Sequence, residues 1–290
     1  MPRYAYVNGR YVPHADATVH IEDRGFQFAD GVYEVVTVVG GRLADEEGHL
    51  VRLGRSLGEL RIAWPVAPGT LKLLMRELIR RNRLSNGLVY IQVTRGVAPR
   101  DFKFPARAQS TLVMTARHTR FQTARQVGDG VPVVTTPDIR WLRRDIKSVA
   151  LLPQVLAKQK AVEAGAFEAW MVDPDGTVTE GSSSNAWIVT KDNVLVTRPP
   201  STMILNGVTR LSLLRLAAKL GLKVEERAFT VAEAMAAKEA FLSSASTFCL
   251  PVTAIDGRPV GNGHPGTVTR ALREAYMADQ GVADPVPVPA

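Results

Sequence analysis

The stretch Trp141-Leu-Arg-Arg-Asp-Ile-Lys-Ser148 is followed, 33 residues after its lysine, by the stretch Val178-Thr-Glu-Gly-Ser-Ser-Ser-Asn185. Lys147 carries an amine that can form a Schiff base with a carbonyl group. Glu180 carries a carboxylate that, once the fold fixes it, can keep a pyridinium nitrogen protonated. Pyridoxal-phosphate chemistry requires both of these protein groups, so this pairing is the most informative feature of the chain.

The neighbours of Lys147 favour a buried position. Ile146, Val149 and Ala150 are apolar and predict that the segment runs into the interior. Burial disfavours the charged form of a lysine and lowers its pKa, which supplies the neutral amine that a nucleophile needs. A lysine taken singly is more often a solvated surface residue, so the hypothesis depends on this context.

Small polar residues, among them Ser182 and Ser183, follow Glu180 directly. They open onto Ala186-Trp-Ile-Val189, an apolar run that is typical of a strand. The polar stretch Gly181-Ser-Ser-Ser-Asn185 is either a solvated turn or a floor of hydroxyls and backbone amides around a polar ligand. Both interpretations stay open from the residues alone.

The composition is that of a soluble globular protein with a sizeable core. The chain has 290 residues, of which 46% are hydrophobic and 22% charged, and these values are ordinary for such proteins. Its apolar runs are far shorter than the roughly 18 residues of a membrane helix. The N-terminus has no signal-peptide core, and a single cysteine, Cys249, excludes an internal disulfide. We therefore expect a cytoplasmic protein with no membrane partner.

The net charge of +8 raises the question of nucleic acid. The arginines are scattered, however, and no nucleic-acid motif accompanies them. An anionic cofactor and anionic substrates explain part of the excess. The five histidines are dispersed, without metal-ligand spacing to Cys249. We predict neither a nucleic-acid partner nor a metal, and a non-catalytic basic binding protein is kept as a rival class.

Hydrophobic periodicity predicts a mixture of strands and helices. The predicted strands are residues 4–7, 10–12, 32–39, 88–94, 111–115, 131–136, 168–172, 186–189, 194–197, 240–242 and 252–255. The predicted helices are residues 50–62, 71–84, 151–164, 208–220 and 267–278. Asn8-Gly9 between the first two strands predicts a type I′ turn. Because βα alternation is not regular, the pattern predicts an α+β fold rather than a doubly wound sheet.

A polar stretch, residues 118–130, is the predicted domain boundary. It divides the chain into a smaller N-terminal α+β domain, residues 1–121, and a larger C-terminal domain, residues 122–290.

Two further stretches are rich in hydrogen-bond donors. Asn206-Gly-Val-Thr-Arg210 precedes an amphipathic helix, and the first amides of a helix attract a phosphate. Ser243-Ser-Ala-Ser-Thr247 follows a predicted strand. The alternatives to a ligand-binding role for these stretches are a plain helix start and a solvated turn. Neither a P-loop nor a GxGxxG motif is present in the sequence.

Seven segments, in order along nearly the whole chain, resemble fold-type IV pyridoxal-phosphate enzymes, and most closely the D-amino acid aminotransferases. They are Glu22-Asp-Arg-Gly-Phe-Gln-Phe-Ala-Asp-Gly-Val-Tyr-Glu34, His49-Leu-Val-Arg-Leu53, Gln92-Val-Thr-Arg-Gly96, Asp138-Ile-Arg-Trp-Leu-Arg-Arg-Asp-Ile-Lys-Ser148, Val155-Leu-Ala-Lys-Gln159, Glu180-Gly-Ser-Ser-Ser-Asn185 and Leu205-Asn-Gly-Val-Thr-Arg210. The resemblance implies a C-terminal domain with a barrel-like sheet, a cofactor between the two domains, and a homodimer whose partner subunit helps to complete the pocket.

The resemblance also implies a role for each matching residue. Lys147 would carry the Schiff base and move a proton between the substrate α-carbon and the cofactor C4′, and Glu180 would pair with the pyridine nitrogen. The other implied cofactor contacts are phosphate ligands and a residue packed on the ring face: Arg52, Val208, Thr209, Ser244, Ala245 and Ser246 for the phosphate, and Leu205 for the ring. The implied substrate contacts are Tyr33, Arg100, Phe102, Ser182 and Ser183.

One position departs from the family pattern. D-amino acid aminotransferases of the best-known kind hold the substrate carboxylate with an Arg-x-His pair before Phe-Pro. This chain reads Pro99-Arg-Asp-Phe-Lys-Phe-Pro105, so Arg100 is retained and Phe102 replaces the histidine. Arginine remains a forked carboxylate ligand, but the pocket loses one donor and becomes more apolar.

The sequence therefore predicts a transaminase that moves an amino group between a D-amino acid, such as D-alanine, and a 2-oxo acid. The alternatives on the same fold are an (R)-amine transaminase, a branched-chain aminotransferase and 4-amino-4-deoxychorismate lyase. Tyr33-Glu-Val-Val36 and Arg100 favour the first interpretation.

Overall fold

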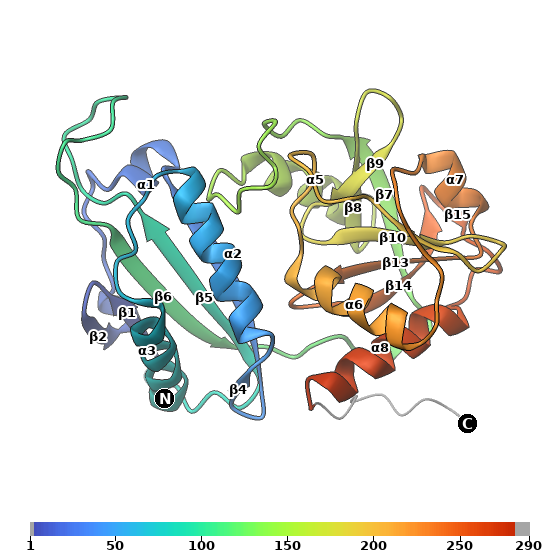
Figure 1. Ribbon diagram of the computed structural model, residues 1–290, viewed down its shortest axis with the longest axis horizontal. Helices are drawn as coiled ribbons and strands as arrows, with labels where there is room; N and C mark the ends of the chain where they lie inside the picture. Colours follow the sequence, from blue (N-terminus) through green and yellow to red (C-terminus); the bar gives the residue numbers. More distant parts are fainter. Residues whose placement is uncertain (1–2, 282–290) are drawn as a thin grey trace. The chain divides into compact units, whose positions relative to one another are not determined.

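The computed structural model describes residues 3–281, which form two compact units (Figure 1). The first unit comprises residues 3–120 together with 146–150, and the second comprises residues 121–145 and 151–281. The chain thus returns to the first unit for five residues, Ile146–Ala150, and these include Lys147. The boundary between residues 121 and 122 stays a prediction about independently folding domains.

The first unit is built on a six-stranded sheet in which every neighbouring pair is antiparallel. Its strand order is β2-β1-β6-β5-β3-β4. The strands are β1 (Tyr4–Val7), β2 (Arg10–Pro13), β3 (Gly31–Val39), β4 (Arg42–Leu43), β5 (Gly87–Thr94) and β6 (Thr111–His118). The helices are the 3-10 turn η1 (His14–Asp16), α1 (Arg24–Phe28), α2 (Glu46–Glu59) and α3 (Pro68–Arg81).

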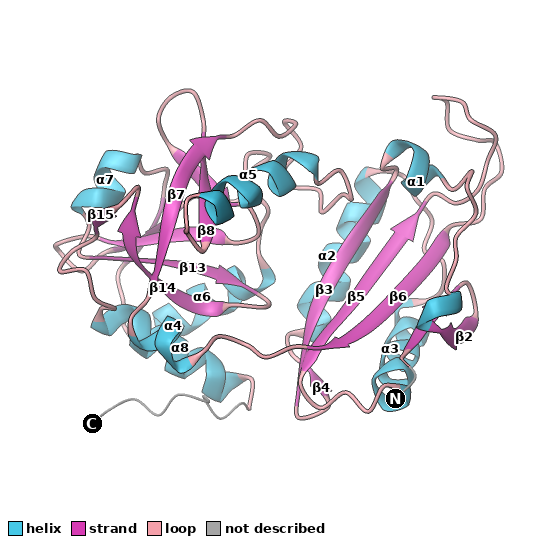
Figure 2. Ribbon diagram, turned by 180° about the vertical axis from the view of Figure 1, so that it is seen from behind, coloured by secondary structure: helices cyan, strands magenta, loops and turns pink. Residues whose placement is uncertain are grey.

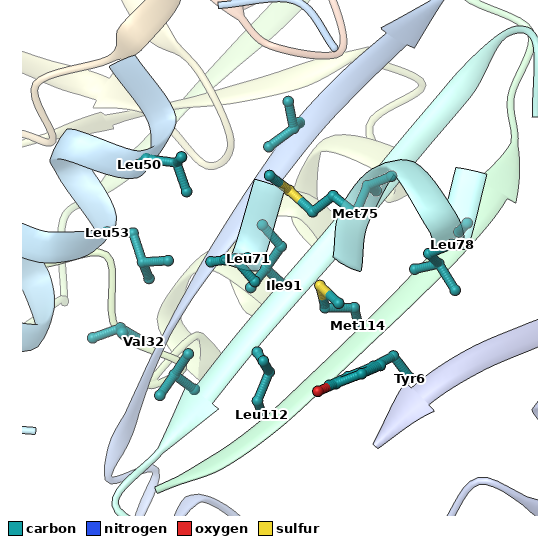
Figure 3. Close-up of a cluster of buried hydrophobic side chains, with 14 of the residues drawn as sticks. Tyr6, Val32, Leu50, Leu53, Leu71, Met75, Leu78, Ile91, Leu112 and Met114 are labelled. Carbon is teal, nitrogen blue, oxygen red and sulfur yellow. The ribbon is translucent and has the colours of Figure 1, made fainter. Parts of the chain in front are cut away.

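Helices α2 and α3 cover one face of this sheet, as both ribbon views show (Figures 1 and 2). Leu50, Leu53 and Leu57 of α2 are buried at helical spacing and face the sheet. Leu71 and Met75 of α3 do the same. Figure 3 shows Leu50, Leu53, Leu71 and Met75 gathered with Ile91, Leu112 and Met114 of the central strands. The core of the unit is therefore a single layer between helices and sheet.

The second unit contains a nine-stranded mixed sheet. Its main path runs β12-β11-β10-β13-β14-β7-β8-β9, and β15 pairs with β14. The strands are β7 (Val131–Pro137), β8 (Glu168–Val172), β9 (Val178–Gly181), β10 (Asn185–Val189), β11 (Leu195–Thr197), β12 (Val224–Glu226), β13 (Glu239–Ser244), β14 (Phe248–Ile255) and β15 (Arg258–Pro259). The helices are α4 (Ala124–Gly128), α5 (Leu152–Glu163), α6 (Val208–Lys219), α7 (Val231–Ala236) and α8 (Thr267–Asp279).

The helices of the second unit pack on different parts of its sheet. Helices α6 and α8 contact β13, and α8 also contacts β14, whereas α5 contacts β7 and β8. Trp187, Phe241 and Phe248 are fully buried beneath α6 and α8. The sheet combines antiparallel pairs with three parallel pairs (β11–β12, β14–β7 and β7–β8), so the predicted α+β class is confirmed.

The observed helix bounds correct two predictions. Helices predicted at residues 50–62 and 71–84 begin at Glu46 and Pro68 instead. Apolar periodicity marks only the buried face, while the first turns are set by other residues. Acidic Glu46 and Glu47 suit the positive end of the helix dipole, and Pro68 occupies a first-turn position that needs no N–H donor.

The predicted type I′ turn is confirmed, because Asn8 and Gly9 have φ values of 43° and 92°. Within residues 3–281, none of the helices combines the length and apolar character needed to span a bilayer.

Candidate active site

Lys147 lies on an extension of the first unit's sheet. Strand β4 pairs only with the far end of β3, at Val38 and Val39, so the other end of that edge is available to another segment. Lys147 and its neighbours occupy it: the Tyr33 N–H donates to the Lys147 carbonyl at 3.0 Å, and the Val149 N–H donates to Gly31. Backbone pairing therefore fixes the position of the lysine.

The side chain of Lys147 is half-buried, which corrects the expectation of a buried lysine. Ile146 does join the core, but Ala150 is exposed. The Lys147 Nζ lies 4.4 Å from the ring centroid of Tyr33. Tyr33 in turn packs against Tyr90, with 5.7 Å between the ring centroids. The amine thus lies against the first of two packed aromatic rings, and the predicted position of Tyr33 beside the substrate stays a prediction.

Burial raises the pKa of Tyr90 to about 12. Its hydroxyl donates to the Gln92 Oε1 at 2.6 Å. Tyr90 is therefore a neutral hydroxyl near neutral pH. Sequence reasoning missed this residue, since an aromatic residue in a strand is normally a packing residue.

Arg52 is held by a buried carboxylate. Its Nε and Nη2 donate to Glu34 at 2.8 Å each, and the His49 Nδ1 lies 2.7 Å from the same carboxylate. Burial alone would raise the pKa of Glu34, but the charge of Arg52 outweighs it and the pKa falls to about 2. A guanidinium has five N–H donors, so this pair leaves the predicted phosphate role of Arg52 open. A variant without Arg52 would leave Glu34 buried without its main partner, which costs about 3–5 kcal/mol.

The loop with the predicted carboxylate ligands is exposed. Arg100 lies over the rings of Phe28 and Phe102, with 5.0 and 5.8 Å to the ring centroids. Phe102 is 80% exposed. Within the first unit, the structure records no contact between Lys147 and either Arg100 or Phe102. Their predicted substrate roles therefore stay predictions.

In the second unit, Glu180 on β9 is buried and accepts hydrogen bonds from three neighbours. Arg140 Nη1 forms a short ion pair with its Oε1. The Asn185 Nδ2 donates to its Oε2 at 2.9 Å, and the Leu205 N–H donates to both oxygens at 3.2 and 3.1 Å. Burial raises the pKa of Glu180, while the charge of Arg140 opposes that shift. The carboxylate is therefore fixed in one orientation.

Arg140 is itself held by a second acid. Its Nε and Nη2 donate to Asp138 at 3.0 and 2.7 Å, a two-pronged contact. Burial would raise the pKa of Asp138, but the hydrogen bonds and charge of Arg140 lower it overall. Arg140 and Asp138 belong to the segment that carries the family resemblance, yet sequence reasoning assigned them no role.

The serine run between β9 and β10 surrounds a buried acid, Glu168. The Ser182 hydroxyl makes a short hydrogen bond to its Oε1. The hydroxyls of Ser183 and Ser184 donate to its Oε2 at 2.8 and 3.2 Å. A serine hydroxyl has one hydrogen, so these hydroxyls face any other group as acceptors. The predicted substrate roles of Ser182 and Ser183 stay predictions.

Helix α6 begins beside the Glu180 group. Gly207 precedes it, and a Cβ at this position would lie 2.1 Å from the Asn185 Oδ1, so only glycine lets Asn185 approach. The helix has no side-chain cap, and the first amides of Val208 and Thr209 are of the kind that bind anions.

A hydroxyl cluster follows β13. The Ser244 hydroxyl lies 2.8 Å from the Thr247 hydroxyl and 3.4 Å from that of Ser246, and Ala245 lies between the two serines. Helix α6 packs on the same strand. The second unit thus gathers two of the predicted phosphate-binding segments around β13.

The structure therefore divides the predicted residues between its two units. Lys147, Tyr33, Arg52, Arg100 and Phe102 lie in the first unit. The second unit holds Glu180, Leu205, Val208, Thr209, Ser182, Ser183 and the residues Ser244, Ala245 and Ser246. The residues that sequence reasoning missed are the charged and polar partners of these groups, above all Arg140 and Glu168.

Comparison with known proteins identifies the family. The model of the family described as "Amino-transferase class IV" matches residues 31–255. The D-alanine aminotransferase of Bacillus licheniformis is 44% identical over 271 residues, which cover 93% of this chain and 94% of the relative. The D-alanine aminotransferase of Listeria monocytogenes is 40% identical over 275 residues, with 94% of each chain covered.

Solved structures give the same fold. The branched-chain amino acid aminotransferase of Thermobaculum terrenum, in its PLP-form, superimposes with a TM-score of 0.85 at 26% identity, covering 97% of this chain and 94% of that chain. The Escherichia coli branched-chain amino acid aminotransferase has a TM-score of 0.90 at 24% identity, covering 98% and 97% of the two chains. These matches confirm the predicted two-domain fold. They also confirm the prediction that the chain is an aminotransferase. This chain belongs to the class IV aminotransferases, the pyridoxal-phosphate enzymes of fold type IV that its sequence motifs resemble.

Proposed function

We propose that this aminotransferase moves an amino group between a D-amino acid, such as D-alanine, and a 2-oxo acid. Its partners are accordingly small amino donors and 2-oxo acids. The identity of 39–44% to several D-alanine aminotransferases over 93% of the chain supports the substrate class. The buried Cys249 fits a cytoplasmic site of action.

The observation that carries the reaction type is the buried Glu180 carboxylate. It is fixed by Arg140, Asn185 and the Leu205 N–H. A carboxylate fixed in this way suits a protonated ring nitrogen, as pyridoxal phosphate would present.

The remaining residues also fit that cofactor. Pyridoxal phosphate, when bound, acts as an electron sink that lets an amino acid lose its α-proton. In the second unit, the helix start at Val208 and Thr209 and the hydroxyls of Ser244 and Ser246 would hold the phosphate, and Arg52 stays a predicted phosphate ligand. The amine of Lys147 would provide the nucleophile and carry the proton.

A donor screen tests the proposal. Purified protein is given pyridoxal phosphate, with pyruvate or 2-oxoglutarate as acceptor, and D-alanine, L-alanine, L-leucine, L-valine or (R)-1-phenylethylamine as donor. We expect D-alanine to be a better donor than L-alanine. The branched-chain aminotransferases are the second candidate, because they share the fold. A strong preference for L-leucine or L-valine would select them and reject the proposal.

Arg100 should determine how well amino acids compete with simple amines. We expect Arg100→Ala to lower kcat/KM for D-alanine by about 10- to 100-fold, the scale of a hydrogen bond to a charged group. Turnover of (R)-1-phenylethylamine should change little, because that amine has no carboxylate. Arg107→Ala, an exposed arginine of the same loop, is the matched control.

Because Phe102 is exposed, a substitution there can be added to the same experiment to test for a gain of activity. Phe102→His would restore a donor and should lower the KM for D-alanine without disturbing the core. Equal losses for D-alanine and the amine in Arg100→Ala would contradict the role of Arg100.

The protein should be a homodimer. Helix α5 exposes Leu152, Val155, Leu156 and Val162, and monomeric proteins rarely expose apolar side chains in such a contiguous group. We expect light scattering to give twice the mass of the chain, and Leu152→Glu combined with Leu156→Glu to give monomers.

The control is Leu73→Glu, on a helix of the first unit. Leu73 is 66% exposed, close to the 69% of Leu152, but has no comparable group around it on α3. A fully active monomer in the unmodified protein would refute the dimer.

A further inference from the structure

We infer that Arg140 is the positioning residue of the Glu180 carboxylate: its guanidinium, fixed by Asp138, holds that carboxylate charged and in one orientation toward the cofactor ring nitrogen. The inference rests on the proposed function, because it assigns a cause to the charge that the reaction uses.

Arg140 is the charged donor among the three groups that contact Glu180 in residues 3–281. Asn185 and the Leu205 N–H are neutral, and neutral donors offset only part of the cost of burying a carboxylate. Both side chains of the ion pair are almost fully buried, at 5% exposed for Arg140 and 6% for Glu180. The charge of Glu180 therefore depends on Arg140.

Orientation comes from the fork of the guanidinium. One edge of Arg140 is clamped by Asp138 through Nε and Nη2, and Nη1 is left to point at Glu180. Asp138 is itself anchored to β9, because it accepts a 2.7 Å hydrogen bond from the Thr179 hydroxyl. Thr179 directly precedes Glu180 in the chain. The acid, the arginine and the strand thus form a closed set of contacts within the second unit.

Further ion pairs continue from Asp138, and positive and negative side chains alternate along them in equal number. Asp138 also lies 3.3 Å from Arg144, which pairs with Asp173 at 2.8 Å, and Asp173 lies 3.4 Å from Arg198. With Arg140 and Glu180, three positive groups face three negative ones. Removal of Arg140 alone would leave an uncompensated buried negative charge, which is costly, and protonation of Glu180 would relieve it. A neutral Glu180 could not support a pyridinium nitrogen.

The binding of two cofactors to the unmodified protein and its variants tests the inference. Dissociation constants are measured for pyridoxal phosphate and for its 1-deaza analogue, in which C–H replaces the ring nitrogen. In the unmodified protein the natural cofactor should bind at least about tenfold more tightly, since a hydrogen bond to a charged group contributes on that scale. In Arg140→Met this preference should fall close to one, whereas affinity for the analogue should be nearly unchanged. Arg140→Lys, which keeps a charge but not the fork, should retain part of the preference.

The control for loss of a buried arginine is Arg273→Met. Arg273 is 2% exposed and donates to the Cys249 carbonyl, so it belongs to the second unit but not to the Glu180 group. It should keep the wild-type preference for pyridoxal phosphate. Equal loss of affinity for both cofactors in Arg140→Met would show a merely structural role and overturn the inference.

A double variant keeps the test decisive if Arg140→Met does not fold. Adding Glu180→Gln removes the unpaired carboxylate, so Arg140→Met/Glu180→Gln should fold and should show the same low preference as Glu180→Gln alone. If Arg140→Lys kept both the full preference and the full kcat, the fork would not matter and the inference would be wrong. An unmodified protein that bound neither cofactor would instead reject the proposed function itself.

Discussion

The Lys147→Ala variant should lose amino transfer almost completely, by more than about 10⁴-fold in kcat. Proton transfer by a positioned side chain alone contributes about 10²–10⁴-fold, and the same amine also provides the covalent attachment. The fold should survive, because the segment is anchored by backbone hydrogen bonds to β3 and by its own N–H to the Ser56 hydroxyl at 3.3 Å. Turnover and thermal unfolding are measured on the same preparation.

Borohydride trapping gives the second readout for Lys147. Reduction of the protein in the presence of pyridoxal phosphate, followed by peptide mapping, should place the adduct on Lys147. Lys158→Ala and Lys160→Ala are the matched controls, since Lys158 and Lys160 donate to the backbone carbonyls of Phe167 and Thr135. An adduct on either of these lysines would show that the assignment is wrong.

The Glu180→Gln variant should raise the activation free energy by about 2–4 kcal/mol, which lowers kcat roughly 30- to 1000-fold. Glutamine keeps the shape of the side chain but removes the charge that would stabilise a protonated ring nitrogen. The amide also places an NH2 group where one carboxylate oxygen had been. That group then faces Arg140, Asn185 or the Leu205 N–H, which are all donors themselves. Some loss of folding stability, about 1–3 kcal/mol, should therefore accompany the loss of activity.

A matched control separates these two effects. Glu239 is another buried carboxylate of the second unit, and it accepts hydrogen bonds from the backbone N–H groups of Val268 and Thr269 at the start of α8. Glu239→Gln should lose stability by a similar amount and keep its kcat. An unchanged kcat in folded Glu180→Gln would remove Glu180 from the reaction.

The sequence by itself determined the family and the fold class. It also predicted Lys147 and Glu180, the two residues on which we propose that the chemistry depends. Local patterns were sufficient for this, because apolar spacing encodes the buried face of each helix and strand. The Lys147 and Glu180 motifs are contiguous runs, and a run can be recognised without knowing what packs against it. The Asn8-Gly9 turn was predictable for the same reason, since two residues with positive φ define it.

The tertiary structure alone decided the partners of these residues. Arg140 reaches Glu180 across 40 residues of sequence, and Glu168 reaches Ser182 across 14. Strand pairing sets which side chains meet, and buried polar groups must find partners among those that the pairing supplies. The same rule placed Lys147 in the first unit, because β4 covers only one end of the β3 edge. No local pattern records that an edge is left open, so the position of the lysine became visible only in the assembled sheet.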